Sequence, residues 1–140
     1  MTRVVCDTNV VVSGLLWAGP PREVLRLAER RAIRLFTSRP LLLELGRVLS
    51  YPRLARVLER ANLTGADLAA WLIEHASLVV PRPLAEPAIP DDPADEQVLA
   101  CAIESGADAI ISGDRHLLAL GVHGGIPILT VRDFLSRTAH

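Results

Sequence analysis

The chain has 140 residues, half of them hydrophobic, which excludes a disordered polymer and is enough for one domain with a sizeable core. Its uncharged runs are too short or too interrupted to span a bilayer, and Asp7 stands too early for a signal peptide. We therefore predict a cytoplasmic protein with a single domain over residues 1–140 and no membrane span.

The first predicted element is an apolar strand that ends on a carboxylate. Val4, Val5 and Cys6 form an uninterrupted apolar run, which is typical of a strand buried on both faces of a parallel sheet. Ligands of open α/β sheets bind beyond the carboxyl ends of the strands, and Asp7 lies at that position. We therefore expect Asp7 to belong to a functional site.

Three helices and a strand are expected next, at residues 9–17, 21–31 and 39–50 for the helices and 33–37 for the strand. In the third helix, which Ser38 can cap, Glu44 lies just outside an apolar arc that consists of Leu41, Leu42, Leu45, Val48 and Leu49. Its carboxylate can therefore reach the boundary of the core, although an ordinary surface glutamate has the same pattern.

A helical pair, a short strand and a proline-rich loop follow at residues 53–61, 65–76, 78–80 and 81–93. Charge is uneven, since residues 22–60 hold ten arginines against four glutamates, and residues 61–114 hold ten acidic residues against one arginine. Two lines of arginines recur at helical spacing: Arg22, Arg26 and Arg30, and Arg53, Arg56 and Arg60. Each line is compatible with phosphate binding and also with a solvated face.

An acidic cluster over residues 91–96 opens a helix that ends at Gly106. Asp92 has the position of the N-cap and Pro93 that of the first helical residue, so both have a structural explanation. Asp95, in contrast, lies on the apolar face of the helix, where a charge without a partner is costly. This position favours a bound cation over an ordinary surface role.

A second apolar strand is expected at residues 109–111, followed by Ser112, Gly113 and Asp114. If it is a parallel neighbour of the first strand, Asp7 and Asp114 lie at the same edge of the sheet. Two adjacent carboxylates repel each other, and a cation relieves that repulsion. The two strands together therefore predict a cation site.

The rest of the chain predicts a helix, a strand and a last helix at residues 115–120, 126–130 and 131–137. Pro127 suggests that the strand lies at a sheet edge. Because no Cys or His pair has metal-ligand spacing, we expect Cys6 and Cys101 to be small buried hydrophobes. We expect all four histidines to be ordinary surface residues: His75, His116, His123 and His140.

Four carboxylates converge in this arrangement: Asp7, Glu44, Asp95 and Asp114. A set of oxygen ligands suits Mg²⁺ or Mn²⁺ rather than Zn²⁺, and protein-bound Mg²⁺ commonly meets a phosphate. Such a site can activate water for attack on a phosphodiester. No Walker loop or GxSxG motif suggests a competing chemistry.

The chain resembles PIN-domain proteins over nearly its whole length, and among them the VapC-like toxins of toxin–antitoxin systems. Each matching motif is short, but their order and spacing are specific. The matching residues are 7–14, 42–45 with 48–49, 51–54, 92–95, 112–114 with 117–118, and 128–135.

The resemblance implies a three-layer α/β/α fold with a central parallel sheet and Mg²⁺- or Mn²⁺-dependent cleavage of RNA. It places the family's acidic metal ligands at Asp7, Glu44, Asp95 and Asp114, and its polar helpers at Thr8, Asn9 and Ser112. It also implies two partners, a cognate antitoxin protein and a second copy of the chain in a homodimer.

Two alternatives remain at this point. A haloacid-dehalogenase-like phosphatase also has an aspartate after its first strand, but it needs a second one two residues later, where this chain has Asn9. A non-catalytic PIN module that acts as a binding partner would be expected to have lost acidic residues, and all four are present here.

Overall fold

The apolar run near the start of the chain forms strand β1 (Thr2–Cys6) in the interior of the sheet. In the computed structural model, which describes residues 1–138, the strand order is β3-β2-β1-β4-β6-β5. The remaining strands are β2 (Ile33–Ser38), β3 (Ala76–Val79), β4 (Ala109–Ile111), β5 (Val122–His123) and β6 (Ile126–Leu129). β1 and β4 are parallel neighbours, with Cys6 opposite Ile111, so the predicted pairing is confirmed.

Helices cover both faces of this sheet, which explains why Val4 and Val5 have no exposed surface. Val4 and Cys6 belong to one core cluster and Val5 to the other, because successive side chains of a strand point to opposite faces. The helices are α1 (Thr8–Leu16), α2 (Pro20–Glu29), α3 (Arg39–Leu49), α4 (Pro52–Arg60), α5 (Gly65–His75), α6 (Pro93–Ser105), α7 (Arg115–Leu120) and α8 (Val131–Thr138).

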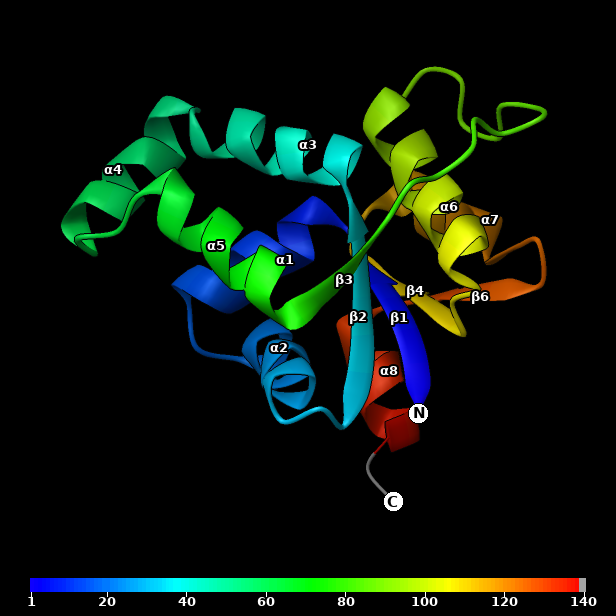
Figure 1. The fold of residues 1–140 in the computed structure, drawn as a ribbon, viewed down its shortest axis with the longest axis horizontal. Coiled ribbons are helices and arrows are strands. Elements are labelled where there is room, and N and C mark those ends of the chain that lie inside the picture. Colours follow the sequence, from blue (N-terminus) through cyan, green and yellow to red (C-terminus); the bar gives the residue numbers. More distant parts are fainter. Residues whose placement is uncertain (139–140) are drawn as a thin grey trace.

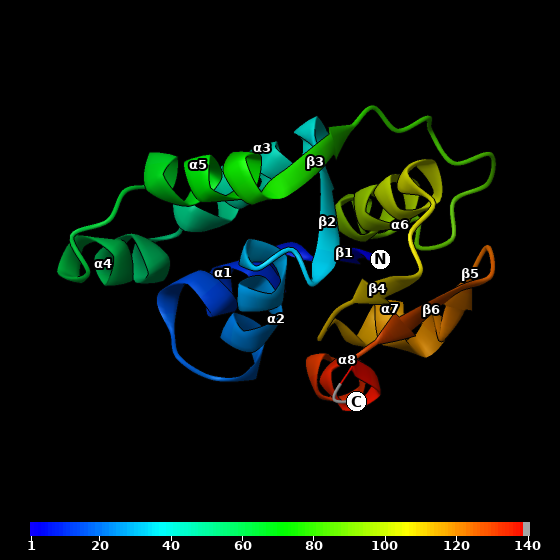
Figure 2. The same ribbon diagram turned by 60° about the horizontal axis from the view of Figure 1, so that its bottom comes forward.

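Helices α6 and α7 pack on the face to which Val5 points, whereas α1, α2 and α8 contribute to the opposite core (Figures 1 and 2). The predicted three-layer α/β/α arrangement with a mostly parallel sheet is therefore confirmed. Within residues 1–138, no helix has both the length and the apolar character needed to cross a membrane.

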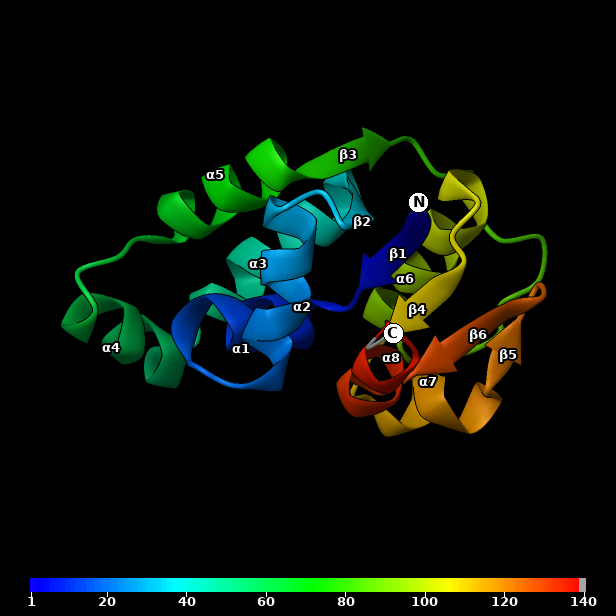
Figure 3. The same cartoon turned by 90° about the horizontal axis from the view of Figure 1, so that it is seen from below.

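The prediction that Pro127 marks a sheet edge is wrong. Strand β5, which the sequence did not indicate, pairs antiparallel with β6 and lies outside it (Figure 3). Proline is compatible with this inner position because the neighbouring Ile128 supplies the N–H that donates to the Gly121 carbonyl, at 2.8 Å. β5 has only two residues, too few for a periodic pattern.

Side chains at the carboxyl edge of the sheet cap the helices that start there. Asp7 accepts a hydrogen bond from Val10 N–H at the start of α1, and Ser38 caps α3. Asp92 caps α6, as predicted, and Asp114 caps α7. Each of the three aspartates uses its Oδ1 atom for the cap. Their Oδ2 atoms therefore remain for other contacts.

The cysteines match the prediction, whereas the histidines match it only in part. Cys6 and Cys101 are both buried and free. His75 is not an ordinary surface residue, because it is half-buried and its ring stacks on Trp71 with a centroid separation of 4.6 Å. His140 lies outside the described residues.

Candidate metal centre

A cleft of about 470 Å³ opens at the carboxyl ends of β1 and β4, where the sequence predicts the site. Most of the predicted site residues line it: Asp7, Thr8, Asn9, Glu44, Asp95 and Asp114. Ser112, the remaining one, is fully buried beneath it. Charged and aromatic side chains outside the predicted ligand set also line the cleft, among them Arg47, Tyr51, Arg53 and Asp92.

Ser112 joins the ends of the two central strands. Its hydroxyl donates to Oδ2 of Asp7 and accepts a hydrogen bond from the backbone N–H of Asp114, at 2.9 Å. Burial raises the pKa of Asp7, and the hydrogen bond from Ser112 partly offsets this effect. The hydroxyl therefore holds Asp7 in place and supports its charged form.

Asp95 points into the cleft from the first turn of α6. Only 6% of its surface is exposed, and its Oδ2 atom has no hydrogen-bond partner within the described residues. Burial, followed by the adjacent carboxyl group of Asp114, raises the pKa of Asp95 to about 8. A buried carboxylate oxygen without a partner is costly, and a bound cation would remove that cost.

Asp114 stays charged beside Asp95. Partial burial acts to raise the pKa of Asp114, but hydrogen bonds, above all that from the backbone N–H of Leu117, keep the pKa below its usual value. The two neighbouring carboxyl groups thus have pKa values shifted in opposite directions, as expected when like charges share a site.

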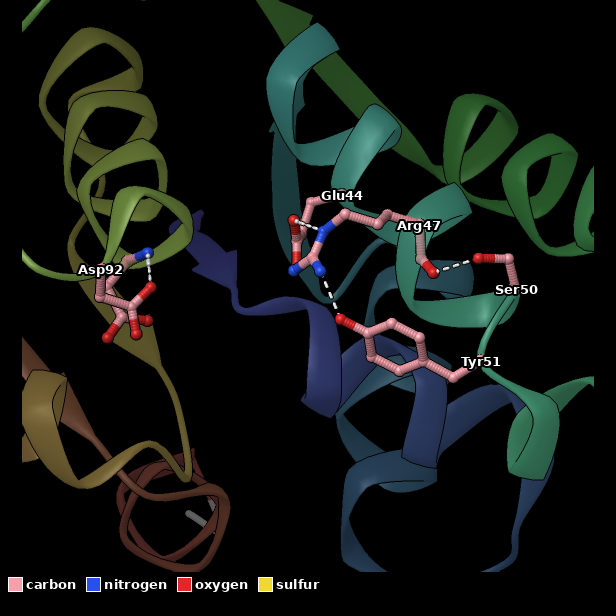
Figure 4. A network of polar contacts seen from close by, with 6 residues as sticks. Glu44, Arg47, Ser50, Tyr51 and Asp92 are labelled. Atoms are coloured by element: carbon pink, nitrogen blue, oxygen red, sulfur yellow. Dashed lines mark hydrogen bonds and ion pairs between the residues drawn. The ribbon is translucent and has the colours of Figure 1, made fainter.

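Glu44 lies on the other wall of the cleft and is already paired. Arg47 donates to both of its carboxylate oxygens, from Nη2 at 2.5 Å and from Nε at 2.9 Å. Nη1 of Arg47 also donates to the hydroxyl of Tyr51, as Figure 4 shows, with Asp92 on the opposite helix across the cleft. The structure therefore places Glu44 in the cleft but outside the cluster of mutually close acidic groups.

That cluster consists of Asp92, Asp95, Asp114 and His116, which each offer one ligand atom within 4.8 Å of the others. Asp92 caps α6 and His116 is exposed, as expected from the sequence, and both also lie close to Asp95 and Asp114. The ring Nδ1 of His116 lies 3.9 Å from Oδ1 of Asp114. His116 follows Asp114 by two residues at the start of α7. This spacing is visible in the sequence, but it is not a standard metal-ligand motif.

The sequence of the chain matches the family model described as PIN domain over residues 3–116. The chain belongs to the PIN-domain family. PIN domains are typically metal-dependent nucleases that use acidic residues to bind divalent ions, and an acidic cluster is present here. Membership of this family argues against the alternative of a haloacid-dehalogenase-like phosphatase.

Among solved structures, the chain is similar to PAE2754 from Pyrobaculum aerophilum, with 18% sequence identity and a TM-score of 0.63. The match covers 99% of this chain and 97% of that one. At this identity the similarity concerns the fold alone. No curated protein matches the sequence.

The donor set of this PIN domain fits a divalent cation. Three carboxylates and one imidazole each offer a ligand atom within 4.8 Å of the others, and one of the carboxylates, that of Asp95, has an Oδ2 atom without a hydrogen-bond partner within the described residues. Carboxylate oxygens suit Mg²⁺ and Mn²⁺, and His116 adds one nitrogen donor to the set. The geometry therefore supports a metal centre on the α6–α7 side of the cleft, with Asp7 and Glu44 as further lining carboxylates.

Proposed function

We propose that this PIN domain is a Mg²⁺- or Mn²⁺-dependent endoribonuclease and the toxin of a toxin–antitoxin module. The observation that carries the nuclease proposal is the buried, unpartnered Oδ2 of Asp95 beside Asp114 at the end of the parallel sheet. Such an atom is expected where a cation binds. The cleft around it is open to a polymer substrate and lies beside exposed arginines.

In this proposal Asp7, Asp95 and Asp114 hold the metal, and Glu44 completes the site once Arg47 releases it. A bound Mg²⁺ or Mn²⁺ lowers the pKa of water and stabilises charge on the phosphate. Ser112 orients Asp7 through its hydroxyl. Thr8 and Asn9, at the start of α1 and on the cleft wall, orient water or substrate oxygens.

The positive charge on α4 is the proposed contact for RNA. Arg53 lines the cleft, and Arg56 and Arg60 are exposed on the same helix. The arginines on α2 are less available to phosphates, because Nε of Arg22 already donates to the carbonyl of Gly14 at 3.2 Å. Phosphates that cross α4 would enter the cleft beside the acidic cluster.

A cleavage assay on labelled single-stranded RNA and on DNA of the same sequence tests the activity. We expect RNA cleavage with Mg²⁺ or Mn²⁺, none with a chelator, and none with Asp114→Asn. Asparagine caps helices about as well as aspartate, so α7 should remain folded in this variant. Asp133→Asn, at the start of α8 and exposed, is the matched control and should cleave normally.

Other outcomes discriminate between the alternatives. RNA binding without cleavage under all metal conditions would support a non-catalytic PIN module that acts as a binding partner. Cleavage of DNA in preference to RNA would contradict the proposed substrate.

The toxin role and the partners rest on the resemblance to VapC-like proteins. A cognate antitoxin should bind the chain and suppress cleavage, and the chain itself should form a homodimer. Induced expression in a bacterial host should arrest growth, and expression of Asp114→Asn should not. Equal growth arrest by the unmodified chain and by Asp114→Asn would show that toxicity does not depend on the metal centre.

A further inference from the structure

We infer that His116 and Asp92 are metal ligands of this centre, which therefore has a mixed nitrogen and oxygen donor set that favours Mn²⁺ and other transition ions over Mg²⁺. The inference rests on the proposed metal centre and is independent of the substrate. It adds two ligands to those expected from the sequence, where Asp92 is a helix cap and His116 a surface residue.

The distances within the cluster are close to those between ligands of one ion. Metal–ligand bonds to Mg²⁺ or Zn²⁺ measure about 2.1 Å, so two ligands on opposite sides of such an ion are about 4.2 Å apart. The four candidate ligand atoms lie within 4.8 Å of one another, which small side-chain adjustments reconcile with a single ion. Nδ1 of His116 is 3.9 Å from Oδ1 of Asp114, too far for a hydrogen bond.

The second observation is the unpartnered oxygen of Asp95. This side chain is more than nine-tenths buried, and its Oδ2 atom accepts no hydrogen bond within residues 1–138. In the same cluster, Asp92 and Asp114 use Oδ1 for their caps. Each of the three aspartates therefore brings an oxygen that its helix does not require.

Backbone contacts hold His116 beside these oxygens. Its own N–H donates to Oδ1 of Asp114 at 2.8 Å, and the next N–H, of Leu117, donates to the same atom at 3.1 Å. The imidazole is thus attached to the first turn of α7, next to a carboxylate of the centre. Its side chain is 55% exposed, so the ring can turn toward an ion without disturbing the core.

A nitrogen ligand changes which ion the site prefers. Mg²⁺ is a hard ion that binds oxygen and keeps several of its waters. Imidazole suits first-row transition ions such as Fe²⁺, Ni²⁺, Cu²⁺ and Zn²⁺, and the affinity of a given site rises from Mn²⁺, the weakest binder of that series, to Cu²⁺. A centre of carboxylates alone would discriminate less between Mg²⁺ and Mn²⁺. The identity of residue 116 therefore decides the metal preference.

Pulsed electron paramagnetic resonance of the full chain with Mn²⁺ tests the ligand directly, because a bound imidazole couples its ¹⁴N nucleus to the metal electron spin. We expect ¹⁴N coupling in the unmodified protein and in His123→Gln, a control at a half-buried histidine that lies outside the cluster. His116→Gln should lose the coupling. The loss of even an outer-shell partner typically weakens metal binding by about 10–100-fold, so the Kd for Mn²⁺ should rise by about tenfold or more.

Titration calorimetry with Mg²⁺ and Mn²⁺ completes the test. His116→Gln should change the Kd for Mg²⁺ much less than that for Mn²⁺. Asp92→Asn keeps the cap of α6 and should raise the Kd for both Mg²⁺ and Mn²⁺. Asp91→Asn, at the exposed neighbouring position, should change neither Kd.

The failures of the two proposals differ. Mn²⁺ bound without ¹⁴N coupling, or with coupling that survives in His116→Gln, would overturn the role of His116 and leave the carboxylate centre intact. An unmodified protein that binds neither ion would overturn both.

Discussion

The two walls of the cleft treat their carboxylates in opposite ways. On the α3–α4 wall, Nε and Nη2 of Arg47 donate to the two carboxylate oxygens of Glu44, so the charge of Glu44 is balanced within the protein. On the α6–α7 wall, His116 is the basic side chain paired with Asp114 among residues 1–138, and there an oxygen of the neighbouring Asp95 has no hydrogen bond. The carboxylate charge is therefore balanced by a cationic side chain on the α3–α4 wall, which we call the complete wall. It is not balanced in this way on the α6–α7 wall, which we call the incomplete wall.

This difference assigns separate roles to the two walls. A carboxylate that already has a cation gains little from a metal, whereas a buried carboxylate beside another one gains much. Metal binding should accordingly depend on α6 and α7. Substrate binding should depend on the arginines of α3 and α4, which face the same space. Variants on each wall can test this division.

The largest effect is expected on the incomplete wall, from Asp95→Asn. The variant keeps the shape of the side chain and removes one of the repelling charges, so the metal-free protein should become more stable. It also removes a ligand, so Mg²⁺ or Mn²⁺ should raise its melting temperature less than that of the parent. Ribonuclease activity should fall by orders of magnitude.

Thermal melts with and without Mn²⁺, run beside the cleavage assay, provide the measurement. Asp91→Asn is the control, because its side chain is exposed and precedes the cap of the same helix. Full activity and an unchanged metal-induced shift in Asp95→Asn would show that the incomplete wall does not bind the metal.

A smaller effect is expected on RNA affinity from the arginines of the other wall. Arg53→Glu combined with Arg56→Glu should weaken RNA binding by about tenfold and reduce the salt dependence, since each lost contact with single-stranded RNA lowers the slope by about 0.7. The matched pair on α2, Arg26→Glu with Arg30→Glu, alters two exposed arginines away from the cleft and should change affinity less. Equal losses from both pairs would contradict the division between the walls.

The incomplete wall also predicts how stability changes with pH. The pKa of Asp95 is raised to about 8, whereas that of an unfolded aspartate is about 3.9. Between these values the folded state binds more protons, so the stability of the metal-free protein should fall as pH rises from about 4 to about 8. Thermal melts in a chelator should show this decline, and Asp95→Asn should reduce it. A melting temperature of the parent that does not change between about pH 4 and about pH 8 would contradict the raised pKa of Asp95.

On both walls, the sequence predicts the residues whose positions follow from local periodicity and misses those that depend on neighbouring elements. Strand ends and helix faces follow from local periodicity, which located Asp7, Glu44, Asp95 and Asp114 at the cleft. The pairing of Glu44 with Arg47 is visible as an i,i+3 spacing, but many surface pairs have that spacing.

The position of His116 depends on how α7 lies beside α6, which is a tertiary contact that no local pattern contains. The same limit explains β5, whose two residues are ordered by their pairing with β6. Residues that act through local geometry were thus predictable, and residues that act through neighbouring elements were not.

The smallest effect concerns the pair that completes the α3–α4 wall. Arg47→Gln keeps a polar side chain but leaves Glu44 without its cation. Because the Arg47 side chain is exposed and such surface pairs contribute little to stability, the metal-free protein should melt only slightly lower than the parent. The freed carboxylate would then face the cleft, where Mn²⁺ attracts it, so the metal-induced rise in melting temperature should exceed that of the parent. Adding Glu44→Gln should cancel this additional rise in melting temperature, because residue 44 then has no carboxylate to bind the metal. If Arg47→Gln left the metal shift unchanged, Glu44 would be a purely structural partner of Arg47, and the metal would depend on the α6–α7 wall and Asp7 alone.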